Sequence, residues 1–521
     1  MPFFKCDDIQ AWTGGTWSGL DPQKKPEIRG FSNDSRNIEK DFAFVALKGE
    51  RDGADFASDA VSNGATAVIA DRPLEVNAPV LVVEDPLKAL QKIAKMHRLR
   101  FENPVVGITG SCGKTSTKEF LAKLMSWRNP LATEKNYNNS IGVPLTLTRI
   151  DMRQNQLAII EAGVSGPGQM GELAEMIEPD ISIVTSVGVA HMEKFGEIGN
   201  VAKEKSILPA SNVNGWCVMH HNLLSWKSFD ELKCKKVILA PENAPDIKAD
   251  IVFRYALIDL PDCIGLDMSV EDGNEYYFEV PHMSRGMIDN TLLSVATALM
   301  LGAKEEQVAV VLRGLKPLPM RGSVAKFDEN AYYIDCYNAS PVSMRDALSR
   351  FEELVPQGVS KLYLLGSMSE LGLARHRHHK DIASRITYAE GYMAILVGES
   401  ANIYKDGLIE AGWPEDSIEI LDDYEKIKSK LDSFKGWIFV KGSRAWALEK
   451  SLPQHVIDKI ESESAEDEGD SVSEPEEIPE QEPQTPDAED DEDDDSFDNS
   501  EDLSDEDDIS ENDDEDEREG I

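Results

Sequence analysis

The sequence predicts an α/β protein of three domains followed by a disordered acidic tail. At 521 residues the chain is long enough for about three domains. Short apolar runs alternate with amphipathic segments up to about residue 456, a pattern typical of parallel sheets covered by helices. Breaks in this pattern give domains over 1–103, 104–320 and 321–456, and a tail over 457–521.

The first domain is predicted from three apolar runs and one amphipathic helix. "FAFVAL" (42–47), "ATAVIA" (65–70) and "APVLVVED" (78–85) have the length and composition of strands. The segment 86–101 places its apolar residues near helical spacing. Asn103-Pro104 then interrupts the helical pattern, and we place the end of the domain there.

The second domain begins with a buried strand, "VVGIT" (105–109), a glycine-rich loop and a helix over 115–127. Two further strands, "LAIIEAG" (157–163) and "DISIVTSVG" (180–188), have a helical segment between them. This alternation predicts a parallel sheet with helices on both faces.

The third domain is predicted because the alternation restarts after residue 320. Its strands are "AYYIDCYN" (331–338), "KLYLLG" (361–366), "YMAILVG" (392–398) and "GWIFVKGS" (436–443), separated by helical stretches. We expect a second parallel, Rossmann-like α/β unit.

Charge is concentrated at the end of the chain. Between Glu461 and Ile521 there are 33 acidic residues and one basic residue, so this segment carries −32 of the net charge of −43. A segment so acidic and so poor in apolar residues is predicted to be disordered, and its partner is unknown. It is either a solvating appendage or a binder of basic partners or cations. The rest of the chain shows no basic stripe, which argues against nucleic-acid binding.

Cysteine usage and the N-terminus predict a cytoplasmic protein. Six scattered cysteines form no Cys-x-x-Cys pair, so neither a disulfide framework nor a zinc site is indicated. The start, "MPFFKCDDIQAW", lacks the basic and apolar regions of a signal peptide. No run of 18 apolar residues occurs, so no membrane insertion is expected.

The stretch "VVGITGSCGKTST" (105–117) has the strand–loop–helix context of a phosphate cradle. In such a loop Lys114 meets the terminal phosphates of a nucleotide and the Thr115 hydroxyl meets magnesium. The common Gly-x4-Gly-Lys spacing is absent, since Ile108 stands where it needs glycine, and an ordinary glycine turn is the alternative. The residues expected at the nucleotide are Thr109, Gly110, Ser111, Cys112, Gly113, Lys114, Thr115 and Ser116.

"GITGSCGKTST" resembles the loop Gly-x-Thr-Gly-Thr-x-Gly-Lys-Thr of the ATP-dependent Mur ligases, with Ser111 in place of a threonine. "NYNNSIGVPLTLTRI" (136–150) is similar to the family's Asn-x-Asn-Asn-x-Ile-Gly-x-Pro stretch. The resemblance covers residues 25–455 and implies ATP and Mg²⁺ as cofactors.

Two further motifs imply metal ligands. "IIEAGVSGPGQM" resembles the family's strand ending in Glu-x-Gly, which makes Glu161 a magnesium ligand. "TSVGVAHMEKFG" resembles Thr-Asn-x-Gly-x-x-His-x-Glu-x-Phe-Gly, which makes His191 a second ligand and places Ser186 where the family has asparagine. Carboxylate and imidazole groups at strand ends beside a phosphate loop suit magnesium and phosphate.

"VAKEKSIL" (201–208) resembles the segment in which Mur ligases carbamylate a lysine. The resulting carboxylate bridges two magnesium ions in the family. Lys205, 14 residues after His191, fits this role, and Lys203 is the alternative. Together with Thr115 and Glu161, the resemblance therefore implies a four-residue metal site.

The resemblance also assigns residues around the two nucleotides. Ser35 and Arg36 lie in a segment similar to the one that holds the uridine-diphosphate sugar, with a plain surface charge as the alternative for Arg36. Arg321, in "PMRGS", corresponds to an arginine that reaches the ATP phosphates when domains close. Asn290 and Asp335 are expected to contact the nucleoside.

Motifs of the third domain favour one branch of the family. "IDCYNASPVSMRDAL" (334–348), "LGSMSELG" (365–372) and "VKGSRAWALEKSL" (440–452) resemble members that add D-alanyl-D-alanine. Ile334 and Ser367 each stand where those members have aspartate.

The resemblance implies an enzyme that joins D-alanyl-D-alanine to UDP-N-acetylmuramoyl-tripeptide through an acyl phosphate, with Lys114, Lys205, His191 and Arg321 in catalysis. We expect it to be a monomer. Two alternatives stay open. One is another ligase of the superfamily, of the diaminopimelate-adding, folylpolyglutamate or cyanophycin type. The other is a catalytically idle nucleotide-binding scaffold whose working part is the acidic tail.

Overall fold

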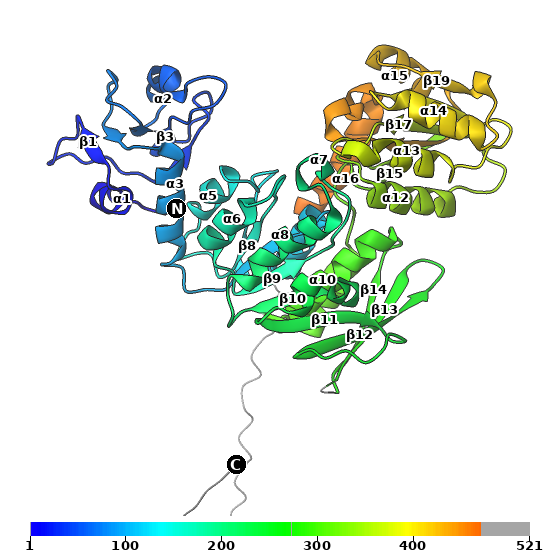
Figure 1. Ribbon diagram of the computed structural model, residues 1–521, viewed down its shortest axis with the longest axis horizontal. Coiled ribbons are helices and arrows are strands. Elements are labelled where there is room, and N and C mark those ends of the chain that lie inside the picture. The colour runs from blue at the N-terminus through cyan, green and yellow to red at the C-terminus, as the bar shows by residue number, and fades with distance from the viewer. Residues whose placement is uncertain (1, 272, 470–521) are drawn as a thin grey trace, which may run out of the picture. The chain divides into compact units, whose positions relative to one another are not determined.

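Three α/β units, each built on its own β-sheet, follow one another along the chain in the computed structural model (Figure 1). The structure describes residues 2–271 and 273–469, with no side chains for 464–469. The predicted disorder of the tail beyond residue 469 concerns residues outside this described part.

The first sheet has five strands in the order β1-β5-β4-β3-β2, and only β1 runs antiparallel to its neighbour. Its strands are β1 (Thr16–Ser18), β2 (Gly30–Ser32), β3 (Phe42–Val45), β4 (Ala67–Ala70) and β5 (Val80–Val82). Its helices are α1 (Cys6–Thr13), α2 (Ala57–Ser62) and α3 (Pro86–Arg98). α1 and α3 cover one face and α2 the other. α3 starts where predicted, because Asp85 accepts hydrogen bonds from the first backbone amides and Pro86 follows it.

The second sheet has nine strands in the order β14-β13-β12-β11-β10-β9-β6-β8-β7. Its strands are β6 (Val105–Thr109), β7 (Leu131–Ala132), β8 (Ala158–Glu161), β9 (Ile181–Val184), β10 (Trp216–His220), β11 (Lys235–Pro241), β12 (Ile251–Asp259), β13 (Ile264–Val270) and β14 (Glu275–Val280). The predicted parallel sheet is confirmed from β7 to β12.

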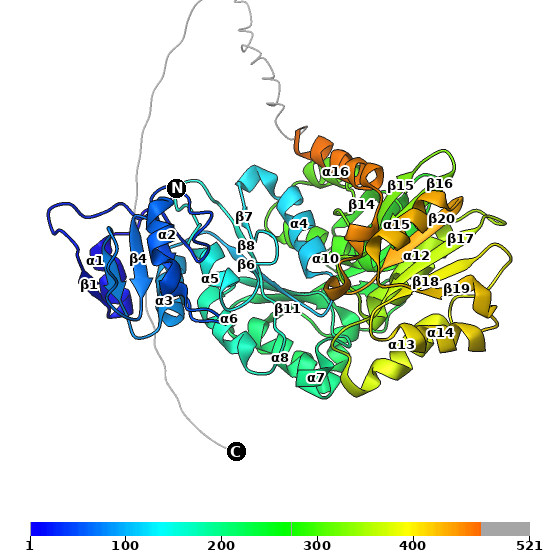
Figure 2. The same cartoon turned by 90° about the horizontal axis from the view of Figure 1, so that it is seen from above.

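Helices cover both faces of this sheet, as Figure 2 shows. They are α4 (Lys114–Leu124), α5 (Gly142–Leu147), α6 (Gln169–Ile177), α7 (Met192–Phe195), α8 (Ile198–Ala210), α9 (Lys227–Asp230), α10 (Arg285–Met300) and α11 (Glu305–Arg313). α4, α10 and α11 pack on one face, and α5, α6 and α8 on the other.

The predicted strand–helix alternation does not contain the antiparallel end of this sheet. Strands β12, β13 and β14 pair antiparallel with one another, although β12 also pairs parallel with β11. Short turns connect them, one of them closed by the Leu260 amide on the Cys263 carbonyl. Such hairpins need no crossover helix, whereas parallel strands do. The sheet therefore ends in a meander rather than in another helix-linked strand.

The third sheet has six strands in the order β15-β16-β20-β17-β18-β19, parallel except for β15. Its strands are β15 (Ser323–Lys326), β16 (Asn330–Ile334), β17 (Lys361–Gly366), β18 (Met393–Val397), β19 (Ile418–Ile420) and β20 (Gly436–Lys441). Its helices are α12 (Pro341–Leu354), α13 (Arg375–Ala383), α14 (Ala401–Glu410), α15 (Tyr424–Ser433) and α16 (Gln454–Gly469). α12, α13 and α14 cover one face, and α15 and α16 the other, so the second parallel unit is confirmed.

α16 differs from the prediction that disorder begins at residue 457, because the helix continues to Gly469. Val456 and Ile460 are buried against the third sheet and Ile457 packs beside them. This apolar side stabilises the helix into the first residues of the acidic segment.

All six cysteines are unpaired thiols, in agreement with the absence of a predicted disulfide framework. Among residues 2–271 and 273–469, no helix combines the length and the apolar character needed to cross a bilayer.

Candidate active site

The glycine loop between β6 and α4 adopts a conformation that requires its glycines. Gly110 has φ +153° and Gly113, which precedes the first residue of α4, has φ +84°. A Cβ atom at Gly110 would lie 1.8 Å from Thr185 Oγ1, and one at Gly113 would lie 2.2 Å from Asn290 Oδ1. The backbone of this loop therefore lies close to its neighbours and leads directly into the N-terminus of α4.

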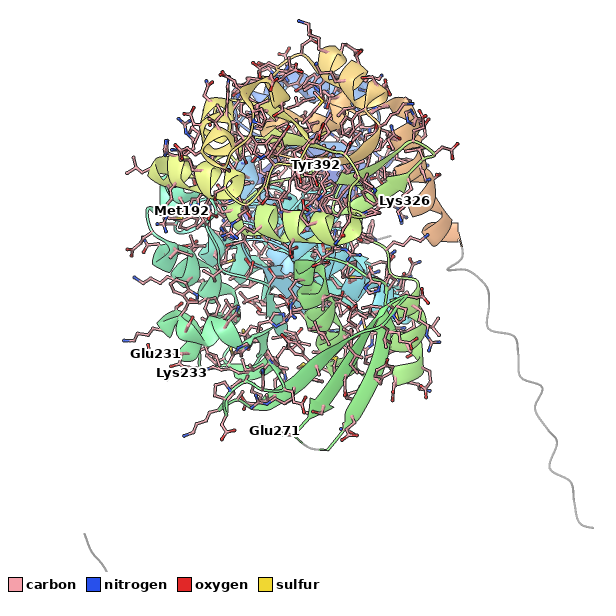
Figure 3. All side chains as sticks on the ribbon, turned by 90° about the vertical axis from the view of Figure 1, so that its right-hand side faces the viewer. Met192, Glu231, Lys233, Glu271, Lys326 and Tyr392 are labelled. Carbon is pink, nitrogen blue, oxygen red and sulfur yellow. The ribbon has the colours of Figure 1, made fainter. Side chains whose placement is uncertain are left out.

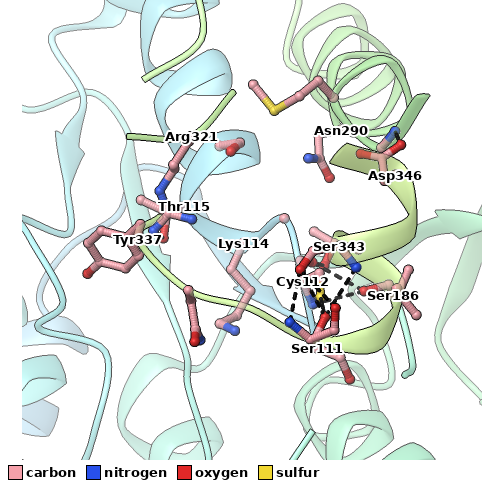
Figure 4. Close-up of a pocket in the computed structure, with 18 of the residues that line it drawn as sticks. Ser111, Cys112, Lys114, Thr115, Ser186, Asn290, Arg321, Tyr337, Ser343 and Asp346 are labelled. Carbon is pink, nitrogen blue, oxygen red and sulfur yellow. Dashed lines mark hydrogen bonds between the residues drawn. The ribbon is translucent and has the colours of Figure 1, made fainter. Parts of the chain in front are cut away.

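The loop is tied to the segment after β9, its neighbour in the sheet. The Ser111 amide donates to the Ser186 carbonyl at 2.9 Å, and the Cys112 amide donates to Ser186 Oγ at 3.0 Å. The Ser111 hydroxyl donates to the Gly188 carbonyl at 3.2 Å. Figure 4 shows this cluster. Ser186, which replaces the asparagine of the family motif, thus holds the loop through its own hydroxyl.

Two lysines converge on one carbonyl of the loop. Lys114 Nζ donates to the Gly110 carbonyl at 2.9 Å, and Lys205 Nζ donates to the same oxygen at 3.0 Å. Lys205 is 3% exposed, and its burial, with the charge of Lys114, lowers the pKa of its amine to about 7. Lys203, two residues away on α8, is exposed. Of the two predicted carbamylation candidates, only Lys205 lies beside the loop.

Glu161 ends β8 with a carboxylate that is 1% exposed. Its Oε1 accepts a hydrogen bond from Asn138 Nδ2 at 2.7 Å, and its backbone amide donates to Thr133 Oγ1 at 2.9 Å. Its Oε2 is buried without a hydrogen-bond partner. A buried carboxylate oxygen without a partner is costly unless a cation binds it, so this residue fits a magnesium ligand.

Within the described part of the chain, no three His, Cys, Asp or Glu side chains form a ready-made metal site.

His191 lies after β9 and has a left-handed backbone, with φ +53°. Its Nδ1 is 2.5 Å from Glu370 Oε2, which belongs to the third domain. Burial and the charges of Lys114 and Lys205 lower the pKa of His191, although Glu370 opposes them. The lowered pKa favours the neutral form of the His191 imidazole, which lies near two lysines and one carboxylate.

Arg321 and Asp335 bring the third domain to the loop. Arg321 Nη2 donates to Thr115 Oγ1 at 3.2 Å, and its guanidinium lies 4.0 Å from the centre of the Tyr337 ring. Asp335 accepts a hydrogen bond from the buried Lys441 Nζ at 2.5 Å. Burial raises the pKa of Asp335, although Lys441 opposes the shift. Arg321 thus contacts the residue predicted to meet magnesium.

A cavity of about 1730 Å³ lies between the second and third domains (Figure 4). Its lining includes predicted residues from both domains: Ser111, Cys112, Gly113, Lys114, Thr115, Ser116, His191, Asn290, Arg321 and Asp335.

Ser35 and Arg36 do not line this cavity. The Ser35 carbonyl accepts a hydrogen bond from Asn63, and the exposed Arg36 pairs with Asp34 at 2.8 Å in the first domain. Asp34 raises the pKa of Arg36. The two predicted sugar-nucleotide residues therefore belong to a different surface from the loop.

Three site residues received no role from the sequence. Asn138 orients Glu161, Glu370 contacts His191, and Asp346 accepts a hydrogen bond from the Gly286 amide at 2.9 Å. Each lies far along the chain from its partner, so residue spacing gives no signal for these contacts. The glycine loop, Lys114 and Arg321 line one cavity, and the Glu161 carboxylate lies behind its lining residue Asn138. This arrangement suits a nucleotide triphosphate with a metal ion.

Three family models match successive parts of the chain. Residues 27–98 match "Mur ligase family, catalytic domain", residues 108–298 match "Mur ligase middle domain", and residues 320–444 match "Mur ligase, glutamate ligase domain".

Curated relatives match over nearly their whole length. The chain is 30% identical over 457 residues to the UDP-N-acetylmuramoyl-tripeptide–D-alanyl-D-alanine ligase of Bacillus subtilis, covering 84% of this chain and 94% of the relative. It is 29% identical over 435 residues to the Escherichia coli enzyme of the same name, covering 80% and 92%.

Solved structures share the fold. MurF from Acinetobacter baumannii has a TM-score of 0.74 at 24% identity and covers 88% of this chain and 99% of its own. MurF ligase from Thermotoga maritima, solved in complex with ADP, has a TM-score of 0.68 at 25% identity and covers 84% and 98%. The resemblance inferred from the sequence motifs is thereby confirmed, and the chain belongs to the Mur ligase family.

Proposed function

We propose that this protein is an ATP-dependent ligase that adds D-alanyl-D-alanine to UDP-N-acetylmuramoyl-tripeptide in peptidoglycan synthesis. The relatives matched over most of their length carry this activity in their names. The observation that carries the proposal is the contact of the third domain, through Arg321, with Thr115 of the glycine loop. It brings the domain with the D-alanyl-D-alanine-type motifs to the phosphate cradle, where an amide ligase needs its amine.

In the first step, an oxygen of the tripeptide carboxylate attacks the γ-phosphorus of ATP, and the bridging oxygen leaves with ADP. Lys114 and the loop amides bind the phosphates, and the dipole of α4 favours their negative charge. Arg321 adds a second cation, held in place by the Tyr337 ring at 4.0 Å. Positioning and charge neutralisation are the main contributions of the protein to such a transfer.

In the second step, the free amine of D-alanyl-D-alanine attacks the acyl carbon, loses a proton, and expels inorganic phosphate from a tetrahedral intermediate. Phosphorylation is what makes the carboxylate reactive, since it turns one of its oxygens into a leaving group. Enclosure between two domains limits hydrolysis of the acyl phosphate by water.

Thr115, Glu161, His191 and a carbamylated Lys205 are the proposed magnesium ligands. When bound, magnesium neutralises phosphate charge and polarises the phosphorus–oxygen bonds. The partnerless Oε2 of Glu161 supports this assignment. For Lys205, the supporting fact is a pKa of about 7, because only a neutral amine can attack carbon dioxide.

Asn290 and Asp335 are proposed to contact the nucleoside of ATP, since both line the cavity. Ser35 and Arg36 are proposed to bind the uridine-diphosphate end of the substrate on the first domain. We also propose that the enzyme works as a monomer in the cytoplasm, where its nucleotide substrates occur.

Purified protein would be assayed for phosphate release with ATP, Mg²⁺, the UDP-linked tripeptide and one acceptor at a time. We expect strict dependence on D-alanyl-D-alanine, with diaminopimelate and glutamate inactive as acceptors. Tripeptides with diaminopimelate or lysine at the third position would both be supplied. Turnover with another acceptor alone, or unchanged turnover in Lys114→Ala, would refute the proposal.

A further inference from the structure

Two loops from different domains meet at the proposed metal site. Met192, which follows His191, donates its backbone amide to the Glu370 carbonyl at 2.9 Å. The side chains meet as well, with His191 Nδ1 2.5 Å from Glu370 Oε2. Figure 3 labels Met192, on helix α7. The contact therefore joins backbone and side chain of both loops.

Both partners hold an unusual backbone. His191 has φ +53° and Glu370 has φ +62°, although neither is glycine. A left-handed conformation is unfavourable for a residue with a Cβ atom, so it persists only where the surroundings fix it. Two such residues in contact, one from each domain, indicate a junction whose geometry is fixed by the structure around it.

The third domain holds the Glu370 loop through the three residues before it. The Ser367 amide donates to the Val397 carbonyl, Met368 to His379 Nε2, and Ser369 to Ser443 Oγ, all at 2.9 Å. Burial lowers the pKa of His379 to about 4, so its ring stays neutral and accepts this hydrogen bond. Glu370 is thus presented by a prearranged loop.

We propose that Glu370 is a positioning residue through which the third domain orients the His191 imidazole for the metal ion. A carboxylate at Nδ1 favours the tautomer with a proton on Nδ1, which leaves the Nε2 lone pair for a cation. The metal site is then complete only when the two domains are in contact. This inference rests on the proposed function, since it presumes that His191 is a metal ligand.

Two other roles for Glu370 have different consequences. If Glu370 only joined the two domains, its loss would lower the stability of the protein without changing its affinity for the metal ion. A direct substrate contact is also open to it, since its side chain is 52% exposed and it lines the cavity. Substrate contact would change the KM for D-alanyl-D-alanine. Metal affinity therefore separates the proposed role from both.

The test measures Mn²⁺ binding to the full-length protein by electron paramagnetic resonance, with a non-hydrolysable ATP analogue present. Glu370→Gln keeps the side-chain size and the backbone contact but removes the carboxylate. We expect its apparent Mn²⁺ affinity to fall about tenfold, the usual cost of losing a partner of a metal-bound histidine. The matched control is Glu197→Gln, which removes one charge from an exposed residue just before α8 and should bind as wild type.

A double-mutant cycle with His191→Gln decides whether Glu370 acts through the histidine. We expect Glu370→Gln to weaken Mn²⁺ binding no further in the His191→Gln background. Equal losses in both backgrounds, or unchanged Mn²⁺ affinity with a raised KM for D-alanyl-D-alanine, would overturn the inference. Thermal unfolding verifies that each variant is folded. Failure of wild type to bind Mn²⁺ or ligate would instead count against the proposed function.

Discussion

The proposed carbamylation of Lys205 should depend on pH in a way that follows from the pKa of its amine. The amine is buried beside the loop and carries a pKa of about 7 instead of the ordinary 10.5. Only the neutral amine attacks carbon dioxide, so the rate of carbamylation should follow its neutral fraction. The perturbation is to strip carbon dioxide from the enzyme and then restore it at fixed dissolved concentration.

The size of the expected effect on the carbamylation rate follows from the lowered pKa of Lys205. At pH 7 an amine with a pKa of about 7 is about half neutral, whereas an ordinary lysine would be about 0.03% neutral. Because the pKa is lowered, the neutral fraction falls as pH falls through 7, from about 90% at pH 8 to about 10% at pH 6. Recovery of activity should therefore be about tenfold slower at pH 6 than at pH 8, and nearly independent of pH above 8.

Phosphate release after the return of carbon dioxide measures this recovery, and carbon-13 NMR with labelled bicarbonate detects the carbamate itself. Lys205→Arg should lose both signals, whereas Lys203→Arg, on the exposed side of α8, should keep them. A recovery rate that keeps rising tenfold per pH unit up to pH 10 would show an ordinary lysine pKa. A carbamate signal that survives in Lys205→Arg would refute the assignment outright.

Three further changes test the site and the tail. Gly113→Ala should lower the free energy of unfolding by about 1–2 kcal/mol, from left-handed strain, and weaken binding of an ATP analogue because its Cβ displaces Asn290. Lys118→Met removes the buried ammonium that donates to the Thr133 carbonyl, so thermal unfolding should show a loss of about 1–3 kcal/mol. Truncation after Gly469 should leave ligation intact, because the cavity is lined by earlier residues. Loss of ligation would give the tail a catalytic role.

The sequence predicted strands best where both faces of the strand are buried. β6, β8 and β17 are buried at every position, so they stand out as continuous apolar runs between glycines and polar turns. β12 mixes buried, partly exposed and exposed residues without a regular period, and it pairs antiparallel with β13. β1 spans only Thr16–Ser18. Because their periodicity is weak or their length is short, these strands could not be predicted from the hydrophobic pattern.

The candidate site likewise contains some positions that the sequence predicts and some contacts that it does not. The positions of the glycine loop and of Glu161 at strand ends were predictable, because parallel strands end at one edge of the sheet and bring consecutive motifs together. Their roles in binding remain predictions. The contacts of Glu370 with His191 and of Asp346 with Gly286 join different domains, so they depend on how the domains pack. The sequence contains the residues of these contacts but gives no spacing that pairs them.

The distribution of charge explains how an acidic chain binds polyanions. The net charge is −43, but surface charges farther apart than about 8 Å are largely screened at physiological salt. The electrostatic potential at a bound phosphate is therefore set mainly by the side chains nearest to it. Lys114, Lys205 and Arg321 converge on the loop from α4, α8 and the start of the third domain. Lys205 has a pKa of about 7 and is therefore only partly protonated at neutral pH, and the proposed carbamylation would replace its amine by an anion. The site would then need magnesium to regain its positive charge. Metal binding and phosphate binding should accordingly be cooperative.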